Sequence, residues 1–154
     1  MAAMADSTAS TALGTDAAAT RPLPGRPLRI LLADDDRDAT LSLSTLLKLE
    51  GYTVQHVYDG NATLAAVREF EPDIVLIDIG MPKLSGYDVA RHIREHYGKE
   101  RPVLVALTGW KQASDRILAT LAGFHHHVAK PYDPGALLEL IRRLERGSGP
   151  LPKR

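Results

Sequence analysis

The run ILLADDDRDAT, residues 30–40, has three consecutive aspartates directly after a series of apolar residues. Adjacent carboxylates repel one another and lose solvation when they are buried, so they are stable only in water or around a cation. The same residues also suit a solvated turn in which an aspartate caps a helix. Both interpretations stay open on this stretch alone.

Other apolar runs also end in a polar side chain: Asp78 after DIVLI, Thr108 after VLVAL and Lys130 after HHVA. Singly, these could be a turn residue, a cap and a surface lysine. If the runs are parallel strands, however, their ends meet Asp34 and Asp35 on one edge of a sheet, where ligands of such sheets gather. Three carboxylates attract a hard cation such as Mg²⁺, and an ammonium and a hydroxyl can hold phosphoryl oxygens. One aspartate could then attack phosphorus and form an acyl phosphate.

The segments that must position these side chains alternate between short apolar runs and longer stretches of helical periodicity. The runs are LRILLA (28–33), YTVQHV (52–57), DIVLID (73–78), PVLVAL (102–107) and HHVAK (126–130). Strands that are buried on both faces and joined by helical crossovers require a parallel sheet with helices on both sides. The pattern therefore predicts an α/β fold, a doubly wound five-stranded parallel sheet with five helices.

Periodicity also predicts which helical residues face the core. Gly51 is expected to end the first helix in the left-handed conformation. The predicted core-facing residues of three helices are Ala39, Leu43, Leu46 and Leu47, then Val89, Ile93 and Tyr97, and finally Leu137, Leu140, Ile141 and Leu144.

The length, cysteine content and charge of the chain limit the kinds of protein that it can be. The 154 residues correspond to about one domain. The absence of cysteine excludes thiol catalysis and a disulfide framework, and is compatible with a reducing compartment. Nineteen basic residues balance nineteen acidic ones, so the chain has no net positive charge with which to attract a nucleic acid. No run reaches the roughly 18 apolar residues that a membrane span needs. We therefore expect a cytoplasmic protein without nucleic-acid or membrane partners.

The two ends differ from the middle of the chain. Residues 1–26 are rich in Ala, Thr, Ser and Pro and lack the pattern of a signal or transit peptide, so we expect a disordered extension. Residues 27–146 are expected to form the folded domain. Residues 147–154 are expected to be a flexible tail.

Together, these motifs resemble the receiver domains of response regulators in two-component signalling, which have a flavodoxin-like fold. The resemblance covers roughly residues 28–146. It rests on the paired aspartates after the first strand, DIVLIDIGMPKLSGYDVARHIR around Asp78, ALTGW at Thr108 and KP at Lys130, all at spacings typical of the family.

The resemblance implies a role for each residue of the carboxylate site. Asp78 would accept a phosphoryl group from a sensor histidine kinase or a histidine phosphotransfer protein. Asp35, the Asp78 carboxylate and the Gly80 carbonyl would bind Mg²⁺, with Asp34 helping through water. Lys130 would pair with the phosphate.

The resemblance also implies a switch. Thr108, followed by Gly109, would contact the phosphate and move together with His127, which stands at the family's switch aromatic position. Trp110 is expected to flank the pocket. Asp36 falls outside the family's acid pair and is expected to cap a helix.

The run His125–His127 could instead mark a transition-metal site, because imidazole is a common ligand. Strand alternation, however, sends His125 and His127 to one face and His126 to the other, so no shared ligand set follows.

The resemblance implies a phosphoacceptor that catalyses only its own phosphorylation and dephosphorylation, not a conventional enzyme. Only residues 131–154 follow Lys130, so no output domain is expected. The signal would then pass through contacts with other proteins. A homodimer is compatible with this interpretation. One alternative is a receiver-like interaction module that works without phosphorylation. Another is a phosphatase similar to the haloacid dehalogenase enzymes, with Asp34 as nucleophile and Asp36 two residues on, which leaves the Asp78, Thr108 and Lys130 set unexplained.

Overall fold

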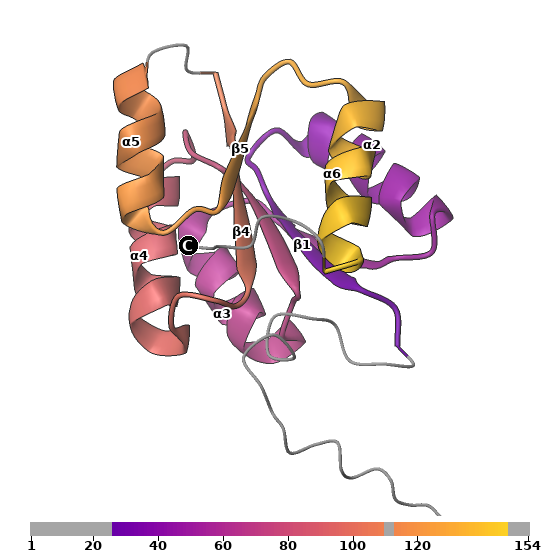
Figure 1. The fold of residues 1–154 in the computed structure, drawn as a ribbon, viewed down its shortest axis with the longest axis horizontal. Helices are drawn as coiled ribbons and strands as arrows, with labels where there is room; N and C mark the ends of the chain where they lie inside the picture. Colours follow the sequence, from indigo (N-terminus) through magenta and orange to yellow (C-terminus); the bar gives the residue numbers. More distant parts are fainter. Residues whose placement is uncertain (1–25, 110–112, 148–154) are drawn as a thin grey trace, which may run out of the picture.

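Strands and helices alternate along the chain in a computed structural model, which describes residues 26–109 and 113–147 (Figure 1). The elements are β1 (Arg29–Ala33), α2 (Arg37–Leu49), β2 (Thr53–Val57), α3 (Gly60–Phe70), β3 (Ile74–Asp78), α4 (Gly86–Tyr97), β4 (Val103–Thr108), α5 (Ala113–Ala122), β5 (His126–Ala129) and α6 (Pro134–Glu145).

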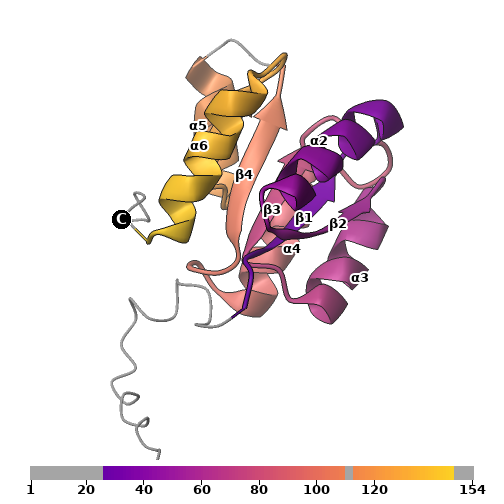
Figure 2. The ribbon, with the colours of Figure 1, turned by 90° about the vertical axis from the view of Figure 1, so that its right-hand side faces the viewer.

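All the strand pairs within these residues are parallel, and the sheet has the order β2-β1-β3-β4-β5. Helices α2 and α6 pack on one face of the sheet, and α3, α4 and α5 pack on the other (Figures 1 and 2). The doubly wound five-stranded sheet with five helices is therefore confirmed.

Each strand contributes to two cores, because successive side chains point to opposite faces. In β1, Ile30 and Leu32 join the core under α2 and α6, whereas Leu31 and Ala33 join the core under α3, α4 and α5. The central strands β3 and β4 are buried at every position, as expected for strands covered on both faces.

The predicted helix faces are confirmed in part. All four residues predicted for α6 are buried, and so are Val89 and Ile93 of α4. The prediction for Tyr97 is wrong, because it is the last residue of α4 and is 49% exposed.

The buried face of α2 differs from the hydrophobic pattern. Leu43 and Leu47 are buried as predicted, but Thr40 and Ser44 join them, whereas Ala39 and Leu46 are only partly buried. Thr40 can be buried because its hydroxyl donates to the Asp36 carbonyl at 2.7 Å. Gly51 follows this helix with a φ of 100°, so the expected glycine stop is confirmed.

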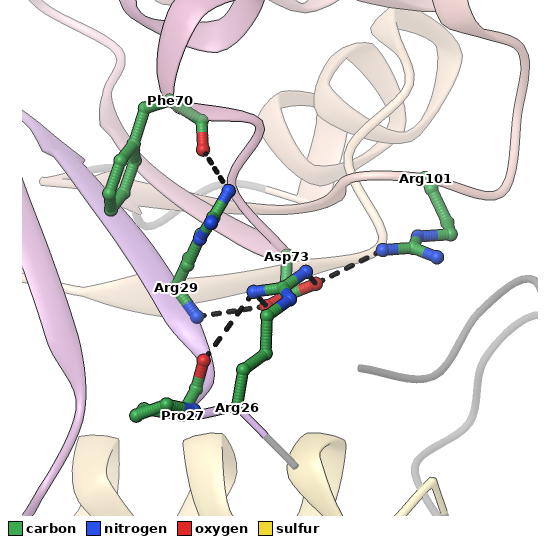
Figure 3. Close-up of polar contacts among 6 residues, drawn as sticks. All are labelled: Arg26, Pro27, Arg29, Phe70, Asp73 and Arg101. Carbon is green, nitrogen blue, oxygen red and sulfur yellow. Dashed lines mark hydrogen bonds and ion pairs between the residues drawn. The ribbon is translucent and has the colours of Figure 1, made fainter. Parts of the chain in front are cut away.

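The predicted terminal extensions lie almost entirely outside the described residues, as residues 1–25 and 148–154. Arg26 is described, and its guanidinium contacts Asp73 (Figure 3). Among the helices of the described residues, none combines the length and apolar character needed to cross a bilayer.

Candidate functional site

Three carboxylates meet at the carboxyl edge of the sheet. Asp34 directly follows β1 and Asp78 ends β3, and these strands are neighbours, with Ala33 opposite Ile77. Carboxylate oxygens of Asp34, Asp35 and Asp78 lie within 4.8 Å of one another. In residues 26–109 and 113–147 this is the one group of three or more potential metal-ligating side chains, so the structure brings together the aspartates that the strand ends predicted.

Asp34 is held on both sides. Its side chain is buried, with Oδ1 accepting from the Asp36 amide at 2.9 Å and Oδ2 lying 3.1 Å from the Lys130 Nζ. Asp35 is exposed at the mouth of the cluster. Asp36 caps α2 by accepting from the Ala39 amide at 3.1 Å, as expected, and takes no part in the cluster. The phosphatase alternative, which needs Asp34 and Asp36 to act together, therefore loses its second carboxylate.

Lys130 reaches the cluster from the other side. It follows β5, where its backbone amide donates to the Thr108 carbonyl at 2.7 Å. Its Nζ lies 3.1 Å from Asp34 Oδ2 and 3.5 Å from Asp78 Oδ1. Burial acts to lower the pKa of Lys130, but the hydrogen bond and charge of Asp34, together with Asp78, outweigh it and raise the pKa. The ammonium therefore stays charged.

Asp78 has the most perturbed carboxylate of the site. It is 9% exposed, and its Oδ1 accepts from the Gly80 amide at 3.1 Å. Burial raises its pKa from 3.8 to about 6, and Asp34 adds to this, whereas the Gly80 amide and Lys130 act in the opposite direction. Three carboxylates face one ammonium, so the site carries an excess of negative charge that a cation would compensate.

Magnesium fits this donor set. The cluster offers only oxygen ligands at close range, which is the set that hard divalent cations prefer. Gly80 lies at the cluster through its amide contact with Asp78, while the predicted use of its carbonyl as a ligand stays a prediction.

The predicted hydroxyl and switch residues lie on the neighbouring strands. Thr108 ends β4 beside β3 and is 3% exposed, and Gly109 follows it at the surface. His127 lies opposite Ala106 in β5 and is exposed. Burial, and then the charge of Arg116, lowers the pKa of His127. Trp110 lies outside the described residues, so its predicted place beside the pocket stays a prediction.

The histidine run provides no metal cluster among the described residues. His125 lies just before β5, where its ring contacts the Arg94 guanidinium and the Lys99 carbonyl, and its Nδ1 accepts from the Leu104 amide. This histidine therefore connects the segment before β5 to α4, to the loop that follows α4 and to β4.

Two residues near the site were missed by the sequence reasoning. Tyr132 lies close enough for burial, and then the charge of Asp34, to raise the pKa of its hydroxyl. Gly86 starts α4 so close to β3 that a Cβ there would lie 2.8 Å from Ile79 Cα and 3.0 Å from the Asp78 carbonyl oxygen. Only glycine allows this approach, and the motif LSGYD was its signal.

A family model described as the response regulator receiver domain matches residues 30–142. The chain is 37% identical over 124 residues to the response regulator MprA of Mycolicibacterium vanbaalenii. The aligned region covers 80% of this chain and 53% of that protein. It is also 37% identical over 119 residues to the DNA-binding response regulator MtrA of Mycolicibacterium smegmatis. This alignment covers 77% of the chain and 51% of MtrA. The chain thus spans about half the length of these curated relatives.

Solved structures agree with the fold. A CheY-like response regulator receiver domain protein from Methanospirillum hungatei aligns with a TM-score of 0.72 and 25% identity, covering 79% of this chain and 96% of that one. The receiver domain of the Francisella response regulator 1452 aligns with a TM-score of 0.73 and 20% identity, covering 79% and 99%. The second likeness concerns the fold alone.

Proposed function

The chain belongs to the response regulator receiver domain family, and on that premise we propose that Asp78 accepts a phosphoryl group in a Mg²⁺-dependent reaction. The donor would be the phosphohistidine of a sensor histidine kinase or of a histidine phosphotransfer protein. The observation that carries this proposal is the Asp78 carboxylate itself, which lies within 4.8 Å of two further carboxylates and 3.5 Å from an ammonium.

The environment of Asp78 suits a nucleophile. A pKa of about 6, raised mainly by burial, leaves the carboxylate ionised at neutral pH but more basic than an exposed aspartate. The Gly80 amide and Lys130 both contact Oδ1, which fixes the orientation of the group. In the transfer, an oxygen of Asp78 forms the new bond to phosphorus while the phosphorus–nitrogen bond breaks, and the donor imidazole leaves with the electron pair and takes up a proton.

Asp34, Asp35 and Asp78 would hold the magnesium ion. When bound, it neutralises carboxylate charge and stabilises the phosphoryl oxygens during transfer. Lys130 would contribute the second positive charge, because its Nζ already lies between Asp34 and Asp78. The buried Thr108 and the adjacent Gly109 would offer a hydroxyl and an amide to the oxygens that remain.

The phosphorylated state would signal by a switch at Thr108 and His127. A phosphoryl group adds acceptor oxygens, so the Thr108 hydroxyl gains a charge-assisted hydrogen bond when it turns inward. The space it vacates would let His127 move toward the core. Beryllofluoride with Mg²⁺, an acyl-phosphate mimic, should then change Trp110 fluorescence in the native protein and much less in Thr108→Ala.

Partners and domain limits are part of the proposal. We place the receiver unit at residues 27–146, with phosphodonor proteins as partners, protein contacts as its output and the cytoplasm as its location. MtrA is named as a DNA-binding regulator, but this chain spans only about half of it, so the expected absence of nucleic-acid binding stays a prediction.

The proposal is tested by incubating the protein with Mg²⁺ and a phosphoramidate donor, which carries the same phosphorus–nitrogen bond as phosphohistidine. Intact mass and peptide mapping should place one hydroxylamine-sensitive phosphoryl group on Asp78, and EDTA should prevent its formation. Asp38→Asn, a change in the exposed first turn of α2, is the matched control and should be phosphorylated normally. Failure of the native protein to take up phosphate under these conditions would favour the phosphorylation-independent interaction module.

A further inference from the structure

Two histidines of α4 lie outside the carboxylate site and share an exposed face of that helix. His92 and His96 are four residues apart, which places them one above the other on a helix surface. Both are exposed. Their rings are nearly parallel, with 17° between the planes and 6.4 Å between the centroids. Helix α4 covers one side of the sheet (Figure 1) and buries Val89, Ala90 and Ile93, so the face that carries the two histidines points to solvent.

The hydrogen bonding of His96 determines which ring nitrogen is available. Its Nδ1 lies 3.0 Å from the backbone carbonyl of His92. A carbonyl oxygen only accepts, so this nitrogen carries the proton and donates it. In the neutral ring the lone pair is then on Nε2. Metal-ligating histidines are oriented in the same way, by a carbonyl or carboxylate that binds their other nitrogen.

We propose that His92 and His96 chelate a divalent transition-metal ion of the Ni²⁺, Cu²⁺ or Zn²⁺ class, with the exposed His92 ring turning toward His96 as the ion binds. Imidazole nitrogen suits these ions, and two histidines at this helical spacing form one half of known helical zinc motifs. Mg²⁺ prefers oxygen ligands and is therefore not the ion of this site. Two protein ligands leave the remaining coordination positions to water or to a donor from another molecule.

The chelate would bridge the end of α4. Gly98 follows His96 and Tyr97 and closes the helix by donating its amide to the Arg94 carbonyl. A metal ion shared by His92 and His96 would join the last two turns, so metal binding should protect this end of the helix from fraying. The histidine run near β5 offers no comparable pair, because His125 is already bonded to backbone and Arg94.

The site is tested by calorimetric titration of the whole chain with Ni²⁺ in excess Mg²⁺. We expect one Ni²⁺ per chain, with affinity reduced at least about tenfold in His92→Ala and in His96→Ala, since even loss of an outer-shell partner costs about that much. Alanine is tolerated at exposed helical positions, so both variants should fold. The same titration on Asp35→Asn should give the native Ni²⁺ affinity, which keeps this result separate from the proposed phosphoryl site.

Two further variants decide whether chelation is the cause. His126→Ala/His127→Ala removes two of the three histidines of the run but keeps the pair on α4, and its Ni²⁺ affinity should be native. His96→Ala/Tyr97→His keeps the number of histidines but moves one ring off the shared face, and its affinity should fall as in His96→Ala. Native affinity in either single alanine variant or in the shifted variant, or loss of binding in His126→Ala/His127→Ala, would overturn the site.

Discussion

A buried aspartate lies at each end of β3, at opposite edges of the sheet, and the charges around the two carboxylates differ. Asp73, just before the strand, is 6% exposed, and Asp78, its last residue, is 9% exposed. Asp73 is contacted by the guanidinium groups of Arg26 at 3.2 Å and Arg101 at 3.0 Å, and accepts from the Arg29 amide at 2.8 Å (Figure 3). Asp78 shares the Lys130 ammonium with Asp34 and lies in a cluster with a third carboxylate, Asp35.

Because the two carboxylates are similarly buried, charge balance and not burial distinguishes Asp73 from the proposed phosphoacceptor Asp78. At Asp73 two cations face one anion, and the residue joins the amino ends of three strands, because its amide also donates to the Arg29 carbonyl and its carbonyl accepts from the Val103 amide. At the Asp78 end three anions face one cation, so the site still attracts positive charge.

The largest expected effect concerns chemistry at Asp78. Asp78→Asn keeps the shape of the side chain but removes the nucleophile, so phosphoryl uptake should fall by at least about a thousandfold. Asp73→Asn should retain native uptake per folded molecule, because that carboxylate lies at the opposite edge of the sheet. Labelled phosphate incorporated at the native level into Asp78→Asn would show that another residue is the acceptor.

The next largest effect concerns stability, for which the change at Asp73 is expected to be more damaging than the change at Asp78. Asp73→Asn removes the partner of two arginines and should lower the free energy of unfolding by about 2–3 kcal/mol. This is less than the roughly 3–5 kcal/mol for a fully buried pair, because the side chains of Arg26 and Arg101 are 22% and 32% exposed.

Urea denaturation measures this loss. Glu139→Gln is the control, because it breaks only long, exposed contacts with Arg142 and Arg146 and should cost less than about 0.5 kcal/mol. If Asp73→Asn were as stable as this control, the arginine contacts at the amino edge would have no structural role.

These contrasts also mark how far the sequence could predict the molecule. The alternation of apolar runs and helices predicts the sheet, and the polar residues at its strand ends predict the cluster of Asp34, Asp78 and Lys130. The partners of Asp73 could not be predicted, because Arg26 and Arg101 lie in irregular segments where no periodicity relates them to β3.

Local chemistry limited the prediction in two further places. Thr40 of α2 is buried because its hydroxyl is satisfied by the preceding turn, which a hydrophobic pattern does not record. The spacing of His92 and His96 was visible in the sequence, but their exposure and the Nδ1 contact of His96 required the structure.

A smaller effect is expected at the exposed member of the carboxylate cluster. Asp35→Asn removes one charged oxygen ligand and should weaken Mg²⁺ binding about tenfold or more, while the fold is kept because Asp35 is at the surface. Calorimetric titration with Mg²⁺ measures the affinity, and Asp38→Asn, also at an exposed position, provides the control. Equal Mg²⁺ affinities in the two variants would remove Asp35 from the metal site.

The smallest effect is the pH dependence of stability without metal. The pKa of Asp78 is about 6 in the folded protein and 3.8 in the unfolded chain, so between these values the folded state binds more protons than the unfolded state. The contribution of Asp78 to the free energy of unfolding must therefore fall as pH rises from about 4 to about 6.5. Solvent screening at this partly accessible site keeps this loss to about 1–2 kcal/mol.

Asp78→Asn cannot titrate and should lack this loss, so in EDTA its stability should exceed that of the native protein at pH 7 but not at pH 4. Urea denaturation at both pH values measures the difference. Mg²⁺ should reverse the order at pH 7, because it binds the ionised carboxylate and so stabilises the native fold. A stability difference between the two proteins that is the same at both pH values in EDTA would mean that folding does not raise the pKa of Asp78.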